Sequence, residues 1–315
     1  MVRHTYGSPS TLRVEEVAEP SLEPGHVIVK VAAAGVNMAE WHLTTGEPRI
    51  ARLALGFPRP KRITLGEDVA GVVAAVGPGV TRVRVGDAVF GSARGSWAEL
   101  VSATEELLQP MPEGVTFEQA AGLPMSGYTA LQALRACGPV QGKRIAVTGA
   151  GGGVGSALVQ LASARGARVT AVCSTAKVGF VRELGAHEVI DYTVADPTAV
   201  GQRFDVVLDF AGNLPIRQWK PAIVAGGVLV LGGGEGGGKM LGAVSRSLQA
   251  PFTRGIKVVT LMAMPKGEDL AALAQAVAAG EIRPTFARSY TFAEATQAVD
   301  AVRSAAYAGK VALTP

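Results

Sequence analysis

The hydrophobic positions follow two patterns along the chain. From residue 1 to about 120, short β-rich segments are separated by glycine and proline, and from about 120 to 265, apolar strands alternate with helical patterns. Many short strands at close spacing favour a small barrel or sandwich, whereas alternation of strands and helices favours a parallel sheet covered on both faces. We therefore predict an α/β chain with a β-rich domain at 1–120 and a doubly wound domain at 121–265.

The individual elements follow from the same patterns. In the first region we expect strands at 27–33, 68–76, 87–90 and 97–101. In the second region we expect strands at 144–148, 168–173, 188–190, 204–210, 228–231 and 256–262, and helices at 154–165, 177–184, 216–224 and 240–249. Six strands is the number found in the doubly wound nucleotide-binding fold. In the tail we expect helices at 270–279 and 293–302 and strands at 285–290 and 310–313.

Glycines gather where the strand 144–148 passes into a helix, in the run Gly149-Ala-Gly-Gly-Gly-Val-Gly155. Glycine lets a phosphate approach backbone amides, and the helix N-terminus adds a partial positive charge. Read strictly, the fingerprint is Ala150-x-Gly152-x-x-Gly155, with alanine at the usual first glycine. The motif and its strand–helix context predict a bound dinucleotide. The alternative is a tight strand–helix turn without a ligand.

The residues after the second strand of this region favour NADP over NAD. NAD-specific folds place Asp or Glu there to hold the ribose 2′-hydroxyl. Here Ser174, Thr175 and Lys177 follow the strand, and the next carboxylate is Glu183. Hydroxyls and an ammonium would bind a 2′-phosphate that a carboxylate would repel. The alternative is a turn in which a hydroxyl caps the next helix and Lys177 is solvated.

Composition narrows the classes of function. The net charge of +4 and a pI near 9.2 are mildly basic, and Lys and Arg are scattered, so we expect no nucleic-acid partner. The two cysteines, Cys137 and Cys173, provide no disulfide framework and suit a reducing cytosol. The N-terminus lacks the apolar core of a signal peptide, and no apolar run reaches the ~20 residues of a membrane helix. We expect a cytoplasmic protein with no membrane partner.

Metal ligands are sparse in the sequence. A catalytic zinc needs three protein ligands and a structural zinc needs about four thiolates, but the four histidines have no ligand spacing and there are two cysteines. His42 and Glu67 are the candidates nearest a cleft, and we expect no metal. Without a metal, an isolated ketone has no evident electrophile to polarise it. A conjugated acceptor spreads the developing negative charge, so modest hydrogen bonds suffice.

Several segments together resemble a known family. They are Gly35-Val-Asn37-Met-Ala-Glu-Trp-His42, Leu65-Gly-Glu-Asp-Val-Ala-Gly71, Val85-Gly-Asp-Ala-Val-Phe-Gly91, Ala120-Ala-Gly-Leu-Pro124 followed by Thr129, and Leu184-Gly-Ala-His-Glu-Val-Ile-Asp-Tyr192. In order and over nearly the whole chain, they resemble medium-chain dehydrogenase/reductases of the zinc-free quinone oxidoreductase branch. The resemblance implies a GroES-like catalytic domain at 1–120, completed by 266–315, and a Rossmann domain at 121–265. It also implies NADPH in a cleft between them.

The resemblance assigns roles to particular residues. Asn37 stands where zinc enzymes of the superfamily have a cysteine ligand, and in the zinc-free branch it lies beside the nicotinamide, so it is the expected catalytic residue. It would bond an acceptor's oxygen or orient the carboxamide; the alternative is a loop asparagine bonding its own backbone. Glu67 and Pro124 or Met125 occupy two further ligand positions of the zinc enzymes.

Other matched positions concern the cofactor. Lys177 and Tyr192 match contacts to the adenosine phosphate, and the residues after the fourth and fifth strands match the lining of the ribose and nicotinamide. Tight turns explain those glycines equally well. The expected cofactor-binding residues are Thr129, Gly149, Gly151, Gly152, Gly153, Val154, Gly155, Cys173, Ser174, Thr175, Lys177, Tyr192, Ala211, Gly212, Gly232 and Gly233.

The leading functional hypothesis is an NADPH-dependent reductase of quinones or α,β-unsaturated carbonyl compounds. The chain lacks the tyrosine that enoyl-reductase relatives carry near 46–48, and we interpret Tyr128 as core packing, so water would supply the final proton. An NADPH-binding sensor or interaction protein with little catalysis is the alternative, and a metal-free alcohol dehydrogenase ranks last.

One strand also predicts an oligomer. The segment 256–262 is expected to be the sixth and outermost strand, and it is apolar on both faces with little edge protection. We expect it to pair with its copy in a homodimer. The glycine-rich run 232–238 is expected to form a loop near the site.

Overall fold

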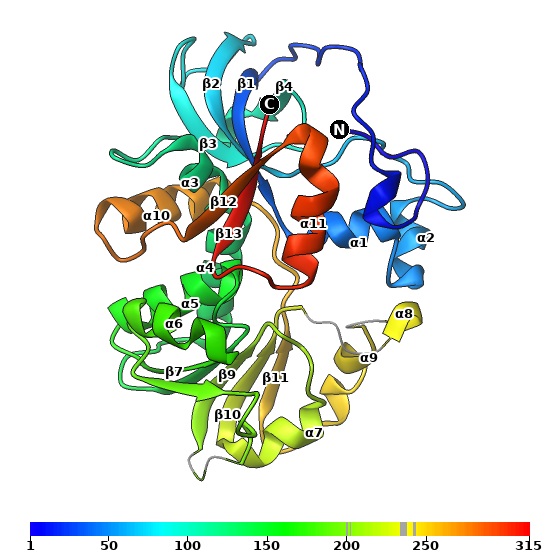
Figure 1. The fold of residues 1–315 in the computed structure, drawn as a ribbon. Helices are drawn as coiled ribbons and strands as arrows, with labels where there is room; N and C mark the ends of the chain where they lie inside the picture. Colours follow the sequence, from blue (N-terminus) through cyan, green and yellow to red (C-terminus); the bar gives the residue numbers. More distant parts are fainter. Residues whose placement is uncertain (200, 202, 234–237, 242–243) are drawn as a thin grey trace. The chain divides into compact units, whose positions relative to one another are not determined.

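The protein is described from a computed structural model that describes residues 1–315 except 200, 202, 234–237 and 242–243. It divides into two compact units (Figure 1). One unit comprises Met1–Tyr128 and Pro265–Pro315, and the other comprises Thr129–Met264. The division falls inside helix α4 (Pro124–Cys137), at 128/129 and not at the expected 120/121.

The first unit is built on a seven-stranded sheet in which β4 pairs with β1 beside the main path β12-β13-β1-β2-β3-β5. The strands are β1 (His26–Val36), β2 (Asp68–Val76), β3 (Ala88–Ser92), β4 (Leu100–Thr104), β5 (Leu108–Pro110), β12 (Phe286–Thr291) and β13 (Lys310–Thr314). The C-terminal strand β13 runs antiparallel to β1, with Val36 opposite Val311. The tail of the chain therefore completes a sheet that the N-terminal segment begins.

Short helices surround this sheet. They are α1 (Met38–Thr45), α2 (Arg52–Leu55), α3 (Phe117–Ala121), α10 (Gly267–Ala278) and α11 (Ala295–Arg303), with 3₁₀ turns η1 (Pro9–Thr11), η2 (Arg49–Ala51), η3 (Glu105–Leu107) and η7 (Phe292–Glu294). The core gathers buried valines, leucines and alanines from the sheet together with Trp97. The amphipathic helix α11 buries Ala295, Ala298 and Val299 on one face, as its periodicity predicts.

The expected strand 97–101 begins later than predicted, at Leu100. Trp97 is fully buried in the preceding bend, where its ring nitrogen donates to the carbonyl of Gly35 at 3.1 Å and its backbone amide donates to Leu65. A large side chain that anchors a loop in the core has the same apolar character as a strand residue, so the pattern alone did not distinguish them.

The second unit is a six-stranded, all-parallel sheet in the order β11-β10-β9-β6-β7-β8. The strands are β6 (Arg144–Thr148), β7 (Arg168–Cys173), β8 (Glu188–Asp191), β9 (Phe204–Asp209), β10 (Ile223–Leu231) and β11 (Lys257–Thr260). The order reverses between β6 and β9, which is the switch point of a doubly wound fold. The segment expected as the outermost strand, 256–262, is β11 at one edge of this sheet.

Helices connect these strands. They are α5 (Gly153–Ala164), α6 (Val178–Glu183), α7 (Ile216–Trp219), α8 (Gly238–Leu241) and α9 (Val244–Ser247), with 3₁₀ turns η4 (Thr175–Lys177), η5 (Lys220–Ala222) and η6 (Ala250–Phe252). The helix predicted at 216–224 ends at Trp219 because Pro221 has no amide hydrogen to continue it, and the chain enters β10 at Ile223. The helix predicted at 240–249 is two short helices in the part that is described.

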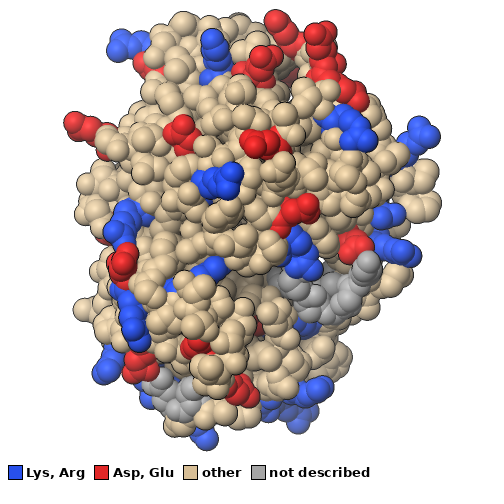
Figure 2. All heavy atoms as spheres, in the orientation of Figure 1, with Lys and Arg blue, Asp and Glu red and all other residues tan. Residues whose placement is uncertain are grey.

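Surface charge is mixed. On the face drawn in Figure 2, basic and acidic side chains are interspersed and form no continuous basic stripe. Among the described residues, no helix is both long and apolar enough to cross a bilayer.

Candidate functional site

The glycine turn after β6 has a geometry that only glycine fits. Gly149 has a φ of +64°, in the left-handed region that L-residues rarely adopt. Gly152 caps α5, and the helix begins at Gly153. A Cβ on Gly155 would lie 2.1 Å from the carbonyl oxygen of Gly149, so the helix approaches the turn more closely than any other residue permits.

The first turn of α5 presents backbone donors at the carboxyl end of the sheet. The amide of Ser156 bonds the carbonyl of Gly152 at 2.8 Å, which is the first bond of the helix ladder. The amides of Gly153, Val154 and Gly155 precede that bond and have no intrahelical partner. These three N–H groups and the positive end of the helix dipole suit the binding of a diphosphate.

A polar network joins β6 to β9 at the switch point. The hydroxyl of Thr148 donates to Oδ1 of Asp209 at 2.6 Å and accepts the amides of Phe210 and Ala211 at 3.0 Å each. The same Asp209 oxygen accepts the amide of Gly212 at 3.0 Å. The network shapes the turn that contains Ala211 and Gly212, two of the expected cofactor-binding residues.

Asp209 also holds a buried arginine. Arg246, in α9, donates through Nη2 to the second oxygen of Asp209, and both side chains are almost fully buried. The Nε and Nη1 atoms of Arg246 have no partner among the described residues. Neither residue of this pair was predicted as a site residue, although an aspartate directly after the apolar run 206–208 at the carboxyl end of a strand is a usable signal.

The end of β7 has a carboxylate beside it that the order of residues along the chain did not predict. Cys173 at the end of β7 lies opposite Asp191 at the end of β8. The Asp191 carboxylate accepts the hydroxyl of Thr175 at 2.5 Å and the amide and hydroxyl of Thr193 at 2.9 and 2.7 Å. These bonds lower the pKa of Asp191. The fold therefore places a carboxylate beside the predicted phosphate-binding residues, and Thr175 is already bonded to it.

Ser174 and Lys177 are the remaining polar candidates at this position. The Lys177 side chain lies across the glycine turn, because a Cβ on Gly151 would meet its Cδ at 2.4 Å. Burial lowers the pKa of Lys177, with the opposing influence of Cys173 smaller. Tyr192, one residue beyond β8, is 56% exposed.

The other expected cofactor residues are arranged as follows. Gly232 lies against the ring of Phe210, where a Cβ would meet ring carbons at 2.1 Å, and Gly233 has a φ of +145°. Thr129 is buried in α4. Cys173, at the end of β7, is also buried, and its burial raises the pKa of its thiol. Of the loop expected at 232–238, residues 234–237 lie outside the described residues.

In the first unit, Asn37 lies in a buried polar cluster between β1 and α1. It is the N-cap of α1, and its backbone amide donates to Oε2 of Glu40 at 2.7 Å. Its side-chain nitrogen donates to Oδ2 of Asp68 at 3.0 Å, and its side-chain oxygen accepts from Nζ of Lys310. The amide thus contacts two side chains that are distant in sequence. Neither Asp68 nor Lys310 was predicted as a site residue from the sequence.

Burial controls the charges of this cluster. It raises the pKa of Asp68 to about 6 and that of Glu40 to about 8, and it lowers the pKa of Lys310. Lys310 opposes the rise at Asp68, and Asp68 opposes the fall at Lys310. Burial also raises the pKa of Tyr128, which is 2% exposed, so its hydroxyl keeps its proton.

The donor set does not suit a zinc ion. An ammonium that contacts Asn37 and lies 3.7 Å from Asp68 would repel a dication at this position. Glu67 accepts a hydrogen bond from the hydroxyl of Ser92 at 2.9 Å, and His42 donates through Nδ1 to the carbonyl of Glu47 at 2.7 Å. Within the described part of the chain, no three His, Cys, Asp or Glu side chains cluster as a metal site requires.

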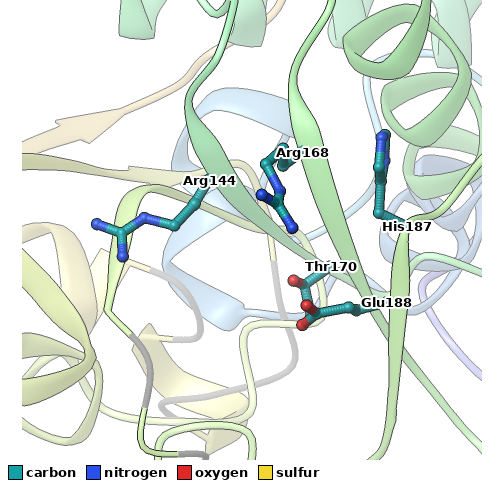
Figure 3. Close-up of a pocket in the computed structure, with 5 residues that line it drawn as sticks. All are labelled: Arg144, Arg168, Thr170, His187 and Glu188. Carbon is teal, nitrogen blue, oxygen red and sulfur yellow. The ribbon is translucent and has the colours of Figure 1, made fainter.

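A small pocket lies at the amino-terminal ends of strands β6, β7 and β8 in the second unit (Figure 3). It has a volume of about 150 Å³ and is lined by Arg144, Arg168, Thr170, His187 and Glu188. Arg144, Arg168 and Glu188 begin β6, β7 and β8. Ligands of doubly wound sheets bind beyond the carboxyl ends of the strands, so this pocket is separate from the glycine turn.

Family models match two parts of the chain. The model described as the alcohol dehydrogenase GroES-like domain matches residues 23–113. The model described as zinc-binding dehydrogenase matches residues 184–313. The expected fold class, a GroES-like domain with a Rossmann-type domain, is therefore confirmed.

Whole proteins match as well. The chain is 30% identical to the chloroplast envelope quinone oxidoreductase homolog of Arabidopsis thaliana, over 93% of this chain and 90% of that protein. The structure of the quinone oxidoreductase from Coxiella burnetii matches with a TM-score of 0.85 and 25% identity, covering 100% of this chain and 98% of that one. A mycobacterial protein solved in complex with NADPH matches with a TM-score of 0.82 and 26% identity over all of both chains.

Proposed function

Because the chain belongs to the medium-chain dehydrogenase/reductase superfamily, among its quinone oxidoreductases, we propose that it reduces quinones or α,β-unsaturated carbonyl compounds with NADPH and without zinc. The observation that carries this proposal is the glycine turn, where Gly155 packs against Gly149 and leaves three helix amides for a diphosphate. The NADPH bound to the mycobacterial neighbour supports the choice of cofactor.

The chain's own residues have separate tasks in this proposal. The amides of Gly153, Val154 and Gly155 hold the pyrophosphate, and Ser174 and Lys177 bind the 2′-phosphate. Bound NADPH supplies a hydride to the acceptor. Asn37 donates a hydrogen bond to the acceptor's oxygen, where negative charge develops. Tyr128 is buried and keeps its proton, so water supplies the final proton.

The test is NADPH oxidation by the purified protein with a panel of quinones and enones, followed by absorbance. We expect turnover with members of both classes and none with simple ketones, because an isolated carbonyl lacks an electrophile here. Absence of turnover on every quinone and enone would rule the proposal out.

An NADPH sensor or interaction protein is the second candidate. The observation that favours it is that both heteroatoms of the Asn37 amide already have partners and the residue is 8% exposed. Tight NADPH binding without turnover on the panel, together with a protein that co-purifies stoichiometrically, would support this candidate over the reductase.

The choice of NADPH over NADH depends on Lys177. Replacing it with alanine removes the ammonium that would pair with the 2′-phosphate, and we expect the Kd for NADPH to rise about 10-fold, as for loss of one charge-assisted bond. The Kd for NADH should change less than twofold. The exposed Lys220, in η5, serves as the control: Lys220→Ala should alter neither. Equal weakening of both nucleotides in Lys177→Ala would contradict this role.

A homodimer is proposed through β11, the edge strand of the six-stranded sheet. Its backbone groups on the outer side are available to pair with a second copy, and Val258 and Val259 are only half-buried. Light scattering coupled to size-exclusion chromatography should give twice the mass of the chain. The amide of Leu261 bonds β10, so by alternation the amide of Val258 faces outward. Val258→Pro, which removes that outward donor, should shift the mass toward the monomer; a monomeric wild-type protein would refute the interface.

A further inference from the structure

The side-chain amide of Asn37 is held at both ends by groups of fixed hydrogen-bonding character. Lys310 contacts Oδ1, and an ammonium only donates. Asp68 lies 3.0 Å from Nδ2, and an ionised carboxylate only accepts. The amide therefore has one chemically consistent orientation, with its oxygen toward Lys310 and its nitrogen toward Asp68.

The two holding groups are themselves immobilised. Lys310 is 6% exposed, and its ammonium also donates to the carbonyl of Val36 at 3.0 Å and lies 3.7 Å from Asp68. Asp68 is fully buried, and its other oxygen accepts the amide of Met125 at 2.9 Å. All three ammonium hydrogens thus have an acceptor nearby. The amide cannot rotate without separating a buried ion pair from its partners, which is costly in a low-dielectric interior.

The net charge of the cluster formed by Asn37, Lys310, Asp68 and Glu40 is close to zero. Glu40 accepts the backbone amide of Asn37, and burial, reinforced by Asp68, raises the pKa of Glu40 to about 8. Glu40 is therefore mostly protonated near neutral pH, and Asp68 alone balances the charge of Lys310. The remaining acid near the cluster, Glu67, bonds Ser92.

We propose that Lys310 and Asp68 are positioning residues that fix Asn37 as a hydrogen-bond donor to the oxygen of the reducible acceptor. This inference rests on the proposed reductase function. The amide nitrogen has a second hydrogen for which the described residues supply no acceptor. The ammonium on Oδ1 draws electron density from the amide and makes that N–H a stronger donor.

The amide's environment can be measured without any reaction, because Asn37 and Asn213 are the only asparagines in the chain. Protein labelled with ¹⁵N-asparagine gives two side-chain NH₂ groups in a nitrogen–proton correlation spectrum. Asn213 is exposed and is an internal reference. We expect the wild-type Asn37 nitrogen and its hydrogen-bonded proton to lie downfield of those of Asn213 and to exchange more slowly with solvent. Equal shifts and exchange rates for both would overturn the inference.

The variant Lys310→Met keeps the length of the side chain and removes its charge. We expect the Asn37 resonances to move upfield while those of Asn213 stay in place. We expect kcat with an enone to fall about 10-fold, since one donor is weakened rather than deleted, with the Kd for NADPH within about twofold of wild type. Lys30→Met, at an exposed position of β1, is the matched control and should leave kcat and the spectrum unchanged. A melting curve establishes that each variant folds.

The outcomes separate the two proposals. Turnover by the wild type together with an unchanged kcat in folded Lys310→Met would overturn the positioning role alone. A wild type inactive on the whole panel would overturn the reductase function, and the positioning role with it. If Lys310→Met does not fold, the wild-type spectrum still decides whether the amide is held as described.

Discussion

Replacement of Gly155 by alanine is expected to abolish tight nucleotide binding. The new Cβ would lie 2.1 Å from the carbonyl oxygen of Gly149 and 2.6 Å from its carbon, both backbone atoms of the turn. The first turn of α5 must therefore move away from the turn, and its amides move with it. Losing about two charge-assisted bonds to the pyrophosphate amounts to roughly 3 kcal/mol, or about 100-fold in Kd for NADPH. Overpacking should also lower the free energy of unfolding by about 1–3 kcal/mol.

Gly179 provides the matched control for this change. It lies in α6 of the same unit, and a Cβ there would meet no atom within 4 Å. Gly179→Ala should leave the Kd for NADPH unchanged and stabilise the helix slightly, because alanine loses less backbone entropy. Calorimetric titration of both variants measures the difference. A Gly155→Ala protein that binds NADPH as the wild type does would mean that the nucleotide does not rest on these amides.

Replacement of Asp209 by alanine is expected to cause the largest loss of stability. Its two oxygens accept from Thr148, Gly212 and Arg246, and the arginine side chain is 6% exposed. The change leaves a buried guanidinium without its counter-ion, which typically costs about 3–5 kcal/mol. Denaturant unfolding monitored by circular dichroism measures the change in the free energy of unfolding.

Asp205→Ala is the corresponding control on the same strand. Asp205 pairs with Arg144 at 3.3 Å, but the two side chains are 32% and 44% exposed. Solvent screens such a pair, so its loss should lower the free energy of unfolding by no more than about 1 kcal/mol. If Asp209→Ala were no more destabilising than Asp205→Ala, the network at the switch point would not stabilise the second unit as we infer.

Local rules account for the part of the fold that the sequence predicts well. The strand β2 (Asp68–Val76) and the strand β6 (Arg144–Thr148) were predicted with their observed bounds, and α5 begins one residue from its predicted start. Strand periodicity, helix periodicity and glycine-rich turns depend on residues close together in the chain. Where another local rule competed, as Pro221 did with an apolar helical pattern, the prediction was wrong.

The glycine turn also belongs to this local class. Its positive φ at Gly149 and its close approach at Gly155 involve residues within one short segment. The sequence therefore identified the turn, although whether a nucleotide binds there stays a prediction. In the same way it identified Asn37 through a resemblance, but not the groups that orient its amide.

The sequence by itself determined the alternation of elements, the apolar strands and the glycine turn, because each depends on neighbours within about ten residues. Only the tertiary structure decided which charges meet. Lys310 reaches Asn37 across 273 positions, Asp209 meets Thr148 across 61, and Thr175 meets Asp191 across 16. Such pairs are set by which strands are adjacent and in what register, and a hydrophobic pattern indicates that a strand exists without naming the strand beside it.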